Sequence, residues 1–147
     1  GVLAGESIRG IQSQGIIATA KHFVLNDQET GRHVVNAVID EAALRESDLL
    51  AFQIAIERGA PGAIMSAYNK INGYYACEND TLLNGVLKGD WAYPGFVMAD
   101  WGATTSVQAA NAGLDQQSGA QLDFRVWFDE PLRASVAAGE TPPERIS

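Results

Sequence analysis

Three short apolar segments of this sequence each end in polar or aromatic residues, and this feature restricts the possible folds more than any other. The segments are residues 15–20, 62–67 and 95–99, and helix-like sequence lies between them. Strands that are apolar along their whole length are buried on both faces, as in parallel sheets covered by helices. Alternation of such strands with helices predicts an α/β fold.

The helices are marked by their boundary residues. Asp40 is a typical N-cap and Gly59 a typical residue after a last turn, so the sequence predicts a helix over residues 40–58. Asp48 falls on the apolar face of that helix, and nothing in the sequence explains it. The other predicted elements are a helix that begins at Asn79 or Asp80 and ends at Lys88, helices over 104–112 and 129–138, and a short fourth strand over 113–115.

Composition and charge exclude several classes of function. The 147 residues include 10 Lys and Arg and 18 Asp and Glu, so the net charge is -8, which argues against nucleic acid as a partner. No apolar run approaches the roughly 20 residues that cross a bilayer, so we expect no membrane partner. Cys77 is the single cysteine and cannot form an internal disulfide. No spacing of ligand residues predicts a metal site, and we expect no cofactor. Nothing in the sequence identifies a cellular compartment.

The residues at the ends of the apolar segments are the candidates for chemistry. They are Lys21 and His22 after the first segment, Tyr68 after the second, and Asp100 and Trp101 after the third. The carboxyl ends of parallel strands meet at one edge, where α/β proteins bind ligands. Asp115 is expected to add a fourth polar side chain there. A carboxylate beside a large aromatic ring suits a carbohydrate, because sugars combine apolar C–H faces with hydroxyl groups.

These candidates also have alternative interpretations. Asp100 could cap the helix that follows it. Lys21 could extend into solvent, keep a neighbouring carboxylate ionised and nucleophilic, or form a Schiff base as in aldolases. Glu29 and Arg32 are expected to form a salt bridge that orders the loop after the first strand, and His33 is expected to be solvated.

Four motifs resemble, in order and spacing, those of glycoside hydrolase family 3. Residues 21–32 (KHFVLNDQETGR) resemble its K-H-F-x-x-N-x-x-E-x-x-R stretch, and residues 65–73 resemble M-x-x-Y-N-x-x-N-G. Residues 95–101 (GFVMADW) resemble the nucleophile strand G-F-V-x-S-D-W, and residues 113–115 resemble the G-L-D that follows. The resemblance extends over about residues 8–146, nearly the whole chain.

This resemblance implies a retaining β-glycosidase on a (β/α)8 TIM-type barrel, with Asp100 as the nucleophile that forms a glycosyl-enzyme. It places six further residues at the sugar subsite: Lys21, His22, Arg32, Met65, Tyr68 and Trp101. The loop after residues 21–23 lacks the P-G-H-G-D of the branch that cleaves N-acetylglucosamine, so the β-glucosidase and β-xylosidase branch is expected. Two departures bear on the site. Ala99 replaces the usual Ser, and residues 116–119 (QQSG) replace L-E-M-P-G.

The resemblance also implies that the chain is incomplete. A closed barrel needs about 250 residues, so residues 1–147, which do not begin with Met, are expected to form about the second half of the N-terminal barrel domain. In this branch the acid/base Glu comes from a C-terminal α/β domain, which this chain lacks. That domain and a β-glucoside or oligosaccharide substrate are the expected partners, and the chain alone is expected to have little or no activity. The competing hypotheses are a non-catalytic carbohydrate-binding relative and a Schiff-base lyase that uses Lys21.

Overall fold

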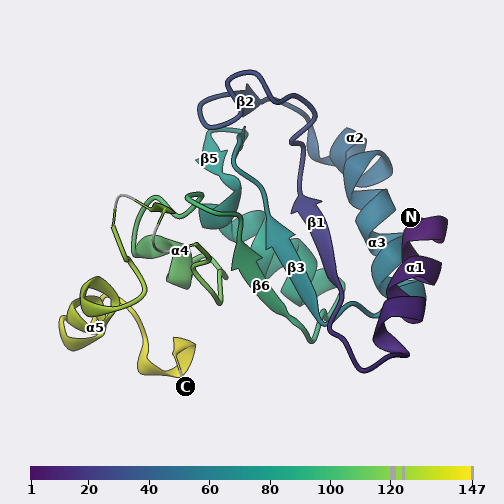
Figure 1. The fold of residues 1–147 in the computed structure, drawn as a ribbon. Coiled ribbons are helices and arrows are strands. Elements are labelled where there is room, and N and C mark those ends of the chain that lie inside the picture. Colours follow the sequence, from purple (N-terminus) through teal and green to yellow (C-terminus); the bar gives the residue numbers. More distant parts are fainter. Residues whose placement is uncertain (120–121, 124, 147) are drawn as a thin grey trace.

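A three-stranded parallel sheet forms the centre of the computed structural model, which describes residues 1–119, 122–123 and 125–146 (Figure 1). Its strands, in spatial order, are β1 (Thr19–Phe23), β3 (Ala63–Ser66) and β6 (Phe96–Ala99). Lys21 is in register with Met65, and Met65 with Met98. Gln116 adds a single parallel bridge beside Met98, which is all that forms of the predicted fourth strand. The predicted α/β class is confirmed, and the assignment of the chain to about the second half of a (β/α)8 barrel stays a prediction.

Helices lie on both sides of the sheet. The elements before β3 are α1 (Val2–Gln12), α2 (Glu41–Glu46) and α3 (Asp48–Gly59). The later ones are the 3₁₀ turn η1 (Ala76–Glu78), the π-helix η2 (Thr81–Asp90), α4 (Gln108–Asn111), α5 (Glu130–Ala137) and the 3₁₀ turn η4 (Pro143–Arg145). Helices α1 and α3 lie side by side at the β1 edge, and α5 lies beyond β6 at the other end of the molecule (Figure 1).

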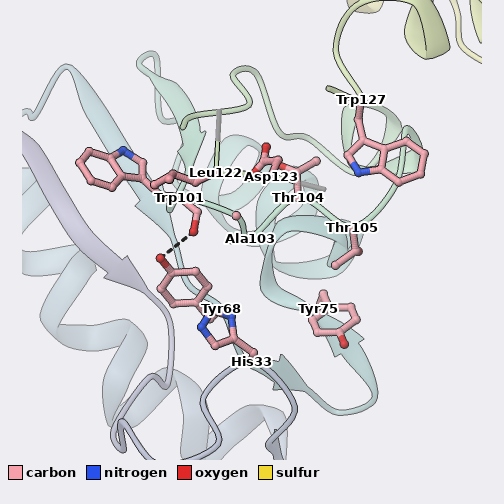
Figure 2. A pocket seen from close by; sticks show the side chains of 11 residues that line it. His33, Tyr68, Tyr75, Trp101, Ala103, Thr104, Thr105, Leu122, Asp123 and Trp127 are labelled. Atoms are coloured by element: carbon pink, nitrogen blue, oxygen red, sulfur yellow. Dashed lines mark hydrogen bonds between the residues drawn. The ribbon is translucent and has the colours of Figure 1, made fainter. Parts of the chain in front are cut away.

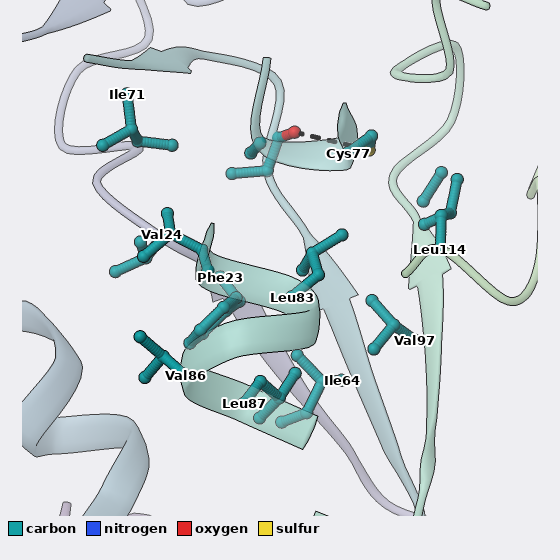
Figure 3. Packing of buried hydrophobic residues seen from close by; sticks show 14 of the residues in the cluster. Phe23, Val24, Ile64, Ile71, Cys77, Leu83, Val86, Leu87, Val97 and Leu114 are labelled. Atoms are coloured by element: carbon teal, nitrogen blue, oxygen red, sulfur yellow. Dashed lines mark hydrogen bonds between the residues drawn. The ribbon is translucent and has the colours of Figure 1, made fainter. Parts of the chain in front are cut away.

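The core lies between the sheet and η2. Leu83 and Leu87 of η2 are fully buried against the sheet, together with Ile64 and Val97 (Figure 3). Ile64 of β3 and Val97 of β6 are each followed along the strand by a methionine, Met65 and Met98, and both methionines are only half-buried. Successive side chains of a strand point to opposite faces, so one face of the sheet is covered by η2 and the other, which carries the two methionines, is more open.

A second, smaller sheet lies beyond the carboxyl ends of the three central strands (Figure 1). Its strands are β2 (Asn36–Ala37), β4 (Lys70–Ile71) and β5 (Tyr74–Tyr75), with β2 parallel to β4 and β4 antiparallel to β5. Asn72 forms the turn at a φ of 50° and exchanges two hydrogen bonds with the backbone of Ile39. This sheet therefore ties the long loop after β1 to the segment after β3.

Two helix boundaries differ from those predicted. The helix over 40–58 starts at Asp40 as expected, whose side chain accepts a hydrogen bond from the Ala43 N–H, but Ser47 divides it into α2 and α3. Asp48 then occupies the first turn of α3, where a carboxylate interacts favourably with the helix dipole, and this accounts for its position. Gly59 is not the residue past the helix end, since Ala60 has that left-handed conformation with a φ of 46°.

Gly59 instead permits close packing of α1 on α3. A Cβ atom at Gly59 would lie 2.7 Å from the Cβ of Ile8, which is closer than two side chains can approach. The sequence could not distinguish this role from a helix-ending glycine, because both place Gly at the same position. The close approach brings Ile8 and Ala55 together in a second, smaller core at the β1 edge.

The first strand and the later helices are also shifted. β1 begins at Thr19 and not at residue 15, because Gly15 has a φ of 75° and the chain becomes regular only after it. The helix predicted over 104–112 is confined to α4, whereas α5 agrees with the predicted 129–138 to within one residue at each end. Of the two candidate caps for η2, it is Asn79 whose side chain accepts a hydrogen bond, from the Leu82 N–H.

Asp115 does not lie with the candidate site residues. Its carboxylate accepts hydrogen bonds from Lys88 at 2.7 Å, from Arg145 at 2.7 Å and from the Val97 N–H at 2.8 Å. Lys88 and Asp115 line one hollow with Gly62 and Phe96, at the amino ends of β3 and β6. Desolvation raises the pKa of Asp115, but the three donors outweigh it and the pKa falls below its ordinary value. The expectation that Asp115 joins the carboxyl edge is therefore wrong.

We expect Leu83 to be essential for stability, because its side chain is fully buried between η2 and the sheet. Leu83→Ala should lower the free energy of unfolding of the protein by about 2–5 kcal/mol, from lost burial and the cavity left behind. Leu83→Met, which nearly conserves volume, should cost less than about 1.5 kcal/mol. Urea unfolding of both variants measures this, and equal losses would contradict the packing described.

Candidate active site

Asp100 lies directly after β6, at the carboxyl edge of the parallel sheet. Its Oδ1 accepts a hydrogen bond of 2.7 Å from the Trp101 backbone N–H, and its Oδ2 lies 3.1 Å from Nε2 of His22. The side chain is 15% exposed. Asp100 is thus held through both oxygens while one side of the carboxylate stays accessible. It caps no helix, because α4 begins only at Gln108.

His22 reaches Asp100 from the neighbouring part of the sheet, across β3. The register between β1 and β3 shifts between Lys21 and Phe23, and His22 is the extra residue at that irregularity. Such bulges re-aim side chains next to functional sites. The contact of Nε2 with Oδ2 of Asp100 becomes an ion pair when His22 is protonated.

The charge state of His22 follows from its surroundings. Burial has the largest effect and lowers the pKa of His22, the charge of Lys21 lowers it further, and Asp100 partly opposes both by raising it. The net pKa lies below the ordinary value of 6.5. The neutral form of His22 is therefore favoured more than in an exposed histidine, and its Nε2 remains in contact with Asp100.

Tyr68 connects the end of β3 with the end of β6. Its hydroxyl donates a hydrogen bond of 2.8 Å to the backbone carbonyl of Trp101, as the dashed line in Figure 2 shows. Burial, followed by the nearby charge of Asp100, raises the pKa of Tyr68 to about 12. The hydroxyl therefore keeps its proton and remains a donor at any physiological pH. Trp101 itself is 59% exposed, so its ring is available to a ligand.

The loop after β1 folds back onto Tyr68. The guanidinium of Arg32 lies 4.3 Å from the centre of the Tyr68 ring, and the ring of His33 lies 4.3 Å from the same centre. Arg32 also forms the predicted salt bridge with Glu29, at 2.7 Å. His33 is an exposed loop residue, as the sequence predicted, and its ring also packs on Tyr68.

Lys21 and Met65 lie on the open face of the sheet. They are in register on β1 and β3, so their side chains share that face, and Lys21 is exposed while Met65 is half-buried. The structure thus brings together His22, Asp100, Tyr68, Arg32 and Trp101 by direct contacts. Lys21 and Met65 are neighbours of this group across the sheet.

A pocket of about 520 Å³ opens beside Tyr68 and Trp101 (Figure 2). Besides His33 from the loop after β1, its lining includes residues that the sequence analysis did not assign to the site, namely Tyr75, Thr104, Thr105, Leu122, Asp123 and Trp127. These come from β5, from the loop after β6 and from the segment before α5. No pattern in the sequence pairs these distant segments with one another.

Two further results concern the described part of the chain. Within it, no group of three or more His, Cys, Asp or Glu side chains is placed to hold a metal ion. None of the helices among the described residues is long and apolar enough to span a membrane.

We expect the pKa of His22 to fall further in Asp100→Asn, because that change removes the charge that raises it. Diethyl pyrocarbonate modifies only neutral imidazole, so the rate of His22 modification against pH, read by peptide mass spectrometry, gives the pKa. Asp40→Asn is the matched control, because Asn is an equally good N-cap. A His22 pKa above 6.5, or one that Asp100→Asn leaves unchanged, would contradict the contact.

The same lowered pKa has a consequence for stability. The unfolded chain binds a proton on His22 at a higher pH than the folded chain does, so protonation favours unfolding. The stability that depends on neutral His22 is complete above about pH 6.5 and is lost as the pH falls toward the folded value.

Comparison with known proteins identifies the family of the chain. The sequence pattern of the glycosyl hydrolase family 3 N terminal domain matches residues 1–123. Probable beta-glucosidase K of Emericella nidulans is 53% identical over 116 residues, which are 78% of this chain and 14% of that protein. Beta-glucosidase B of the same organism is 51% identical over 147 residues, which are 99% of this chain and 17% of that protein.

Solved structures agree as well. The crystal structure of DesR, a beta-glucosidase from Streptomyces venezuelae in complex with D-glucose, superposes with a TM-score of 0.90. It is 39% identical and covers 97% of this chain, which spans 19% of DesR. The chain spans less than a fifth of each of these relatives. Since the family pattern covers residues 1–123 of the 147, this chain belongs to glycosyl hydrolase family 3.

Proposed function

We propose that the protein containing this chain is a retaining β-glucosidase and that Asp100 is its nucleophile. The observation that carries the proposal is the placement of Asp100 at the carboxyl edge of the sheet, oriented by the Trp101 N–H and by His22. Family membership and the names of the relatives support the substrate class. They also favour hydrolysis over a Schiff-base lyase. Among the described residues, no contact of Lys21 supports the lyase hypothesis.

The reaction would proceed by two displacements at the anomeric carbon. A carboxylate oxygen of Asp100 attacks that carbon, the bond to the leaving oxygen breaks, and an acid donates a proton to the departing alcohol. The resulting glycosyl ester is then attacked by water, whose proton returns to the acid/base group while Asp100 leaves as carboxylate. Two inversions give net retention. His22, whose Nε2 lies 3.1 Å from Oδ2 of Asp100, would stay beside the carboxylate in both steps.

The remaining site residues would bind the sugar. Lys21 and Arg32 supply cationic donors for ring hydroxyls, and the exposed ring of Trp101 offers a face for C–H groups. Tyr68 holds the backbone of Trp101 and so fixes the position of that ring. Met65 provides an apolar floor between β1 and β6.

The acid/base group would come from outside this chain. Retaining hydrolysis requires a second carboxyl group roughly 5–5.5 Å from the nucleophile. Among the described residues, the side chains that interact directly with Asp100 are those of His22 and Tyr68, and neither carries a carboxyl group. We propose that residues 1–147 form about half of a (β/α)8 barrel, and that a C-terminal α/β domain supplies the acid/base Glu. The chain spans only a small part of the length of its relatives, and this is consistent with both the half barrel and the additional C-terminal domain.

We expect Asp100→Asn in the whole protein to lower kcat on a β-glucoside by about 10⁴-fold or more, because an amide cannot form the glycosyl ester. A 2-deoxy-2-fluoro-β-glucoside with a good leaving group should label the wild-type protein on Asp100. Asp100→Gly should recover activity with azide and yield the α-glucosyl azide, since azide then attacks from the vacated side.

Asp40→Asn serves again as control and should leave kcat and labelling unchanged. A label on another carboxylate, or β-configured azide product, would overturn the assignment of Asp100. Sugar binding with no turnover and no label in the wild-type protein would instead identify a non-catalytic carbohydrate-binding relative.

We also expect residues 1–147 alone to hydrolyse β-glucosides with at most background rates, because the acid/base group is missing. The rates of this chain and of the whole protein on a chromogenic β-glucoside measure the difference. Circular dichroism of the isolated chain separates loss of catalysis from loss of folding. Turnover by a folded chain comparable to that of the whole protein would contradict the proposal.

A further inference from the structure

We propose that Asn69 is a positioning residue for sugar binding. Its buried side-chain amide closes the base of the loop after β1, residues 25–34, and thereby holds Arg32 at the site. The inference rests on the proposed function, since Arg32 is one of the residues that would bind the sugar. Asn69 follows Tyr68 in the motif over residues 65–73, and the proposed reaction gives it no role of its own.

The amide of Asn69 replaces a backbone donor at the point where β1 and β3 separate. At the end of the two strands, the Ala67 N–H donates a hydrogen bond of 2.8 Å to the Phe23 carbonyl. The next carbonyl, that of Val24, accepts a hydrogen bond of 3.2 Å from Nδ2 of Asn69. Val24 is 1% exposed and Asn69 is fully buried. A buried carbonyl needs a partner, so this side chain keeps Val24 paired after the strands have diverged.

The far end of the loop is attached by the residue that follows Asn69. The Lys70 N–H donates a hydrogen bond of 2.9 Å to the Val35 carbonyl, next to the pairing of β2 with β4. Two consecutive residues therefore hold the two ends of the loop. The chain enters the loop at Leu25, whose φ of 62° is unfavourable for a residue with a side chain. Such a conformation persists only where neighbouring contacts fix it.

Several hydrogen bonds inside the loop are local. Arg32 pairs with Glu29 at 2.7 Å, and Nδ2 of Asn26 donates to the same carboxylate group at 3.3 Å. These contacts fix the shape of the loop but not its orientation relative to the sheet. That orientation depends on the two ends of the loop and on its contacts with Tyr68.

The loop meets the site through Arg32 and His33. The guanidinium of Arg32 and the ring of His33 each lie 4.3 Å from the centre of the Tyr68 ring, and Figure 2 shows His33 beside that ring. The Glu29 side chain is exposed, so its ion pair restrains Arg32 only weakly. The hydrogen bond from Asn69 is buried and is therefore the firmer restraint. A misplacement of binding groups by about 1 Å can cost about 10²-fold in rate.

The amide group is the property of Asn69 that matters. Its Nδ2 also donates to the Lys70 carbonyl at 3.3 Å, whereas its Oδ1 has no hydrogen-bond partner among the described residues. A leucine would fill a similar volume without leaving a buried oxygen unpaired, and burying an unpaired polar atom is costly. The presence of Asn at this position is thus explained by the donor at Nδ2 and not by packing.

The test replaces Asn69 by Leu in the whole protein, which removes the donor and nearly keeps the volume. Hydrogen exchange, read by mass spectrometry, should become about tenfold faster in peptides over residues 25–34 and stay unchanged in peptides over β6. KM for a chromogenic β-glucoside should rise about tenfold, with a smaller change in kcat. Titration with the fluoro-glucoside that labels Asp100 counts the folded active sites, so that kcat refers to folded protein.

A double-mutant cycle separates positioning from a purely structural role. If Asn69 acts through Arg32, Asn69→Leu should raise KM by less than about twofold when Arg32 is already Ala. Effects on KM that multiply in the double variant would overturn the inference, because Asn69 would then act independently of Arg32. If Asn69→Leu does not fold, Asn69→Ala removes the same donor and takes its place in every measurement.

Asn84→Leu is the matched control. Nδ2 of Asn84 also donates to a backbone carbonyl, that of Asn111 at 2.9 Å, but this bond joins η2 to α4. Its loss should leave KM and the exchange of residues 25–34 unchanged. Unchanged exchange and KM in Asn69→Leu would overturn the inference even where Asp100 proves to be the nucleophile. If turnover persists in Asp100→Asn, the proposed function fails, and hydrogen exchange still decides whether Asn69 holds the loop.

Discussion

The parallel pairing of β1, β3 and β6 is the constraint on which the site depends. Because the three strands run in one direction, their carboxyl ends meet, and residues far apart in the sequence become neighbours there. His22 and Asp100 are 78 positions apart in number yet 3.1 Å apart in space. Burial of β3 between two strands and against η2 keeps this register fixed, since a shift by one residue would expose Ile64.

Contacts made by the loops then orient the side chains that the strands bring together. Tyr68 joins the ends of β3 and β6 through the Trp101 carbonyl, and Arg32 and His33 close over the Tyr68 ring from the loop after β1. Gln117 fixes the segment before α5 in a similar way, because its Oε1 accepts hydrogen bonds from the backbone N–H groups of Trp127 and Phe128. The strands therefore determine which residues meet, and the loops determine their orientation.

The candidate site was largely predictable from sequence because strand-end residues are recognisable by position. Asp100, His22 and Tyr68 meet for that reason. The pocket residues Tyr75 and Trp127 were not predictable, since their proximity depends on a small sheet and a loop whose pairing leaves no periodic signal. The sequence analysis placed Asp115 at the wrong edge of the sheet. An Asp at the end of a short apolar segment shows the same pattern whether its carboxylate faces a ligand or pairs with two cations, which here are Lys88 and Arg145.

Asp115, Lys88 and Arg145 lie at the amino ends of the strands, opposite Asp100. The two ends of the sheet therefore differ, since one carries the candidate active site and the other carries an ionic cluster. The ionic cluster joins η2, β6 and η4, so it clamps the last part of the chain to the sheet. Sequence changes at this ionic cluster can alter the stability of the fold while the proposed sugar-binding surface stays unchanged.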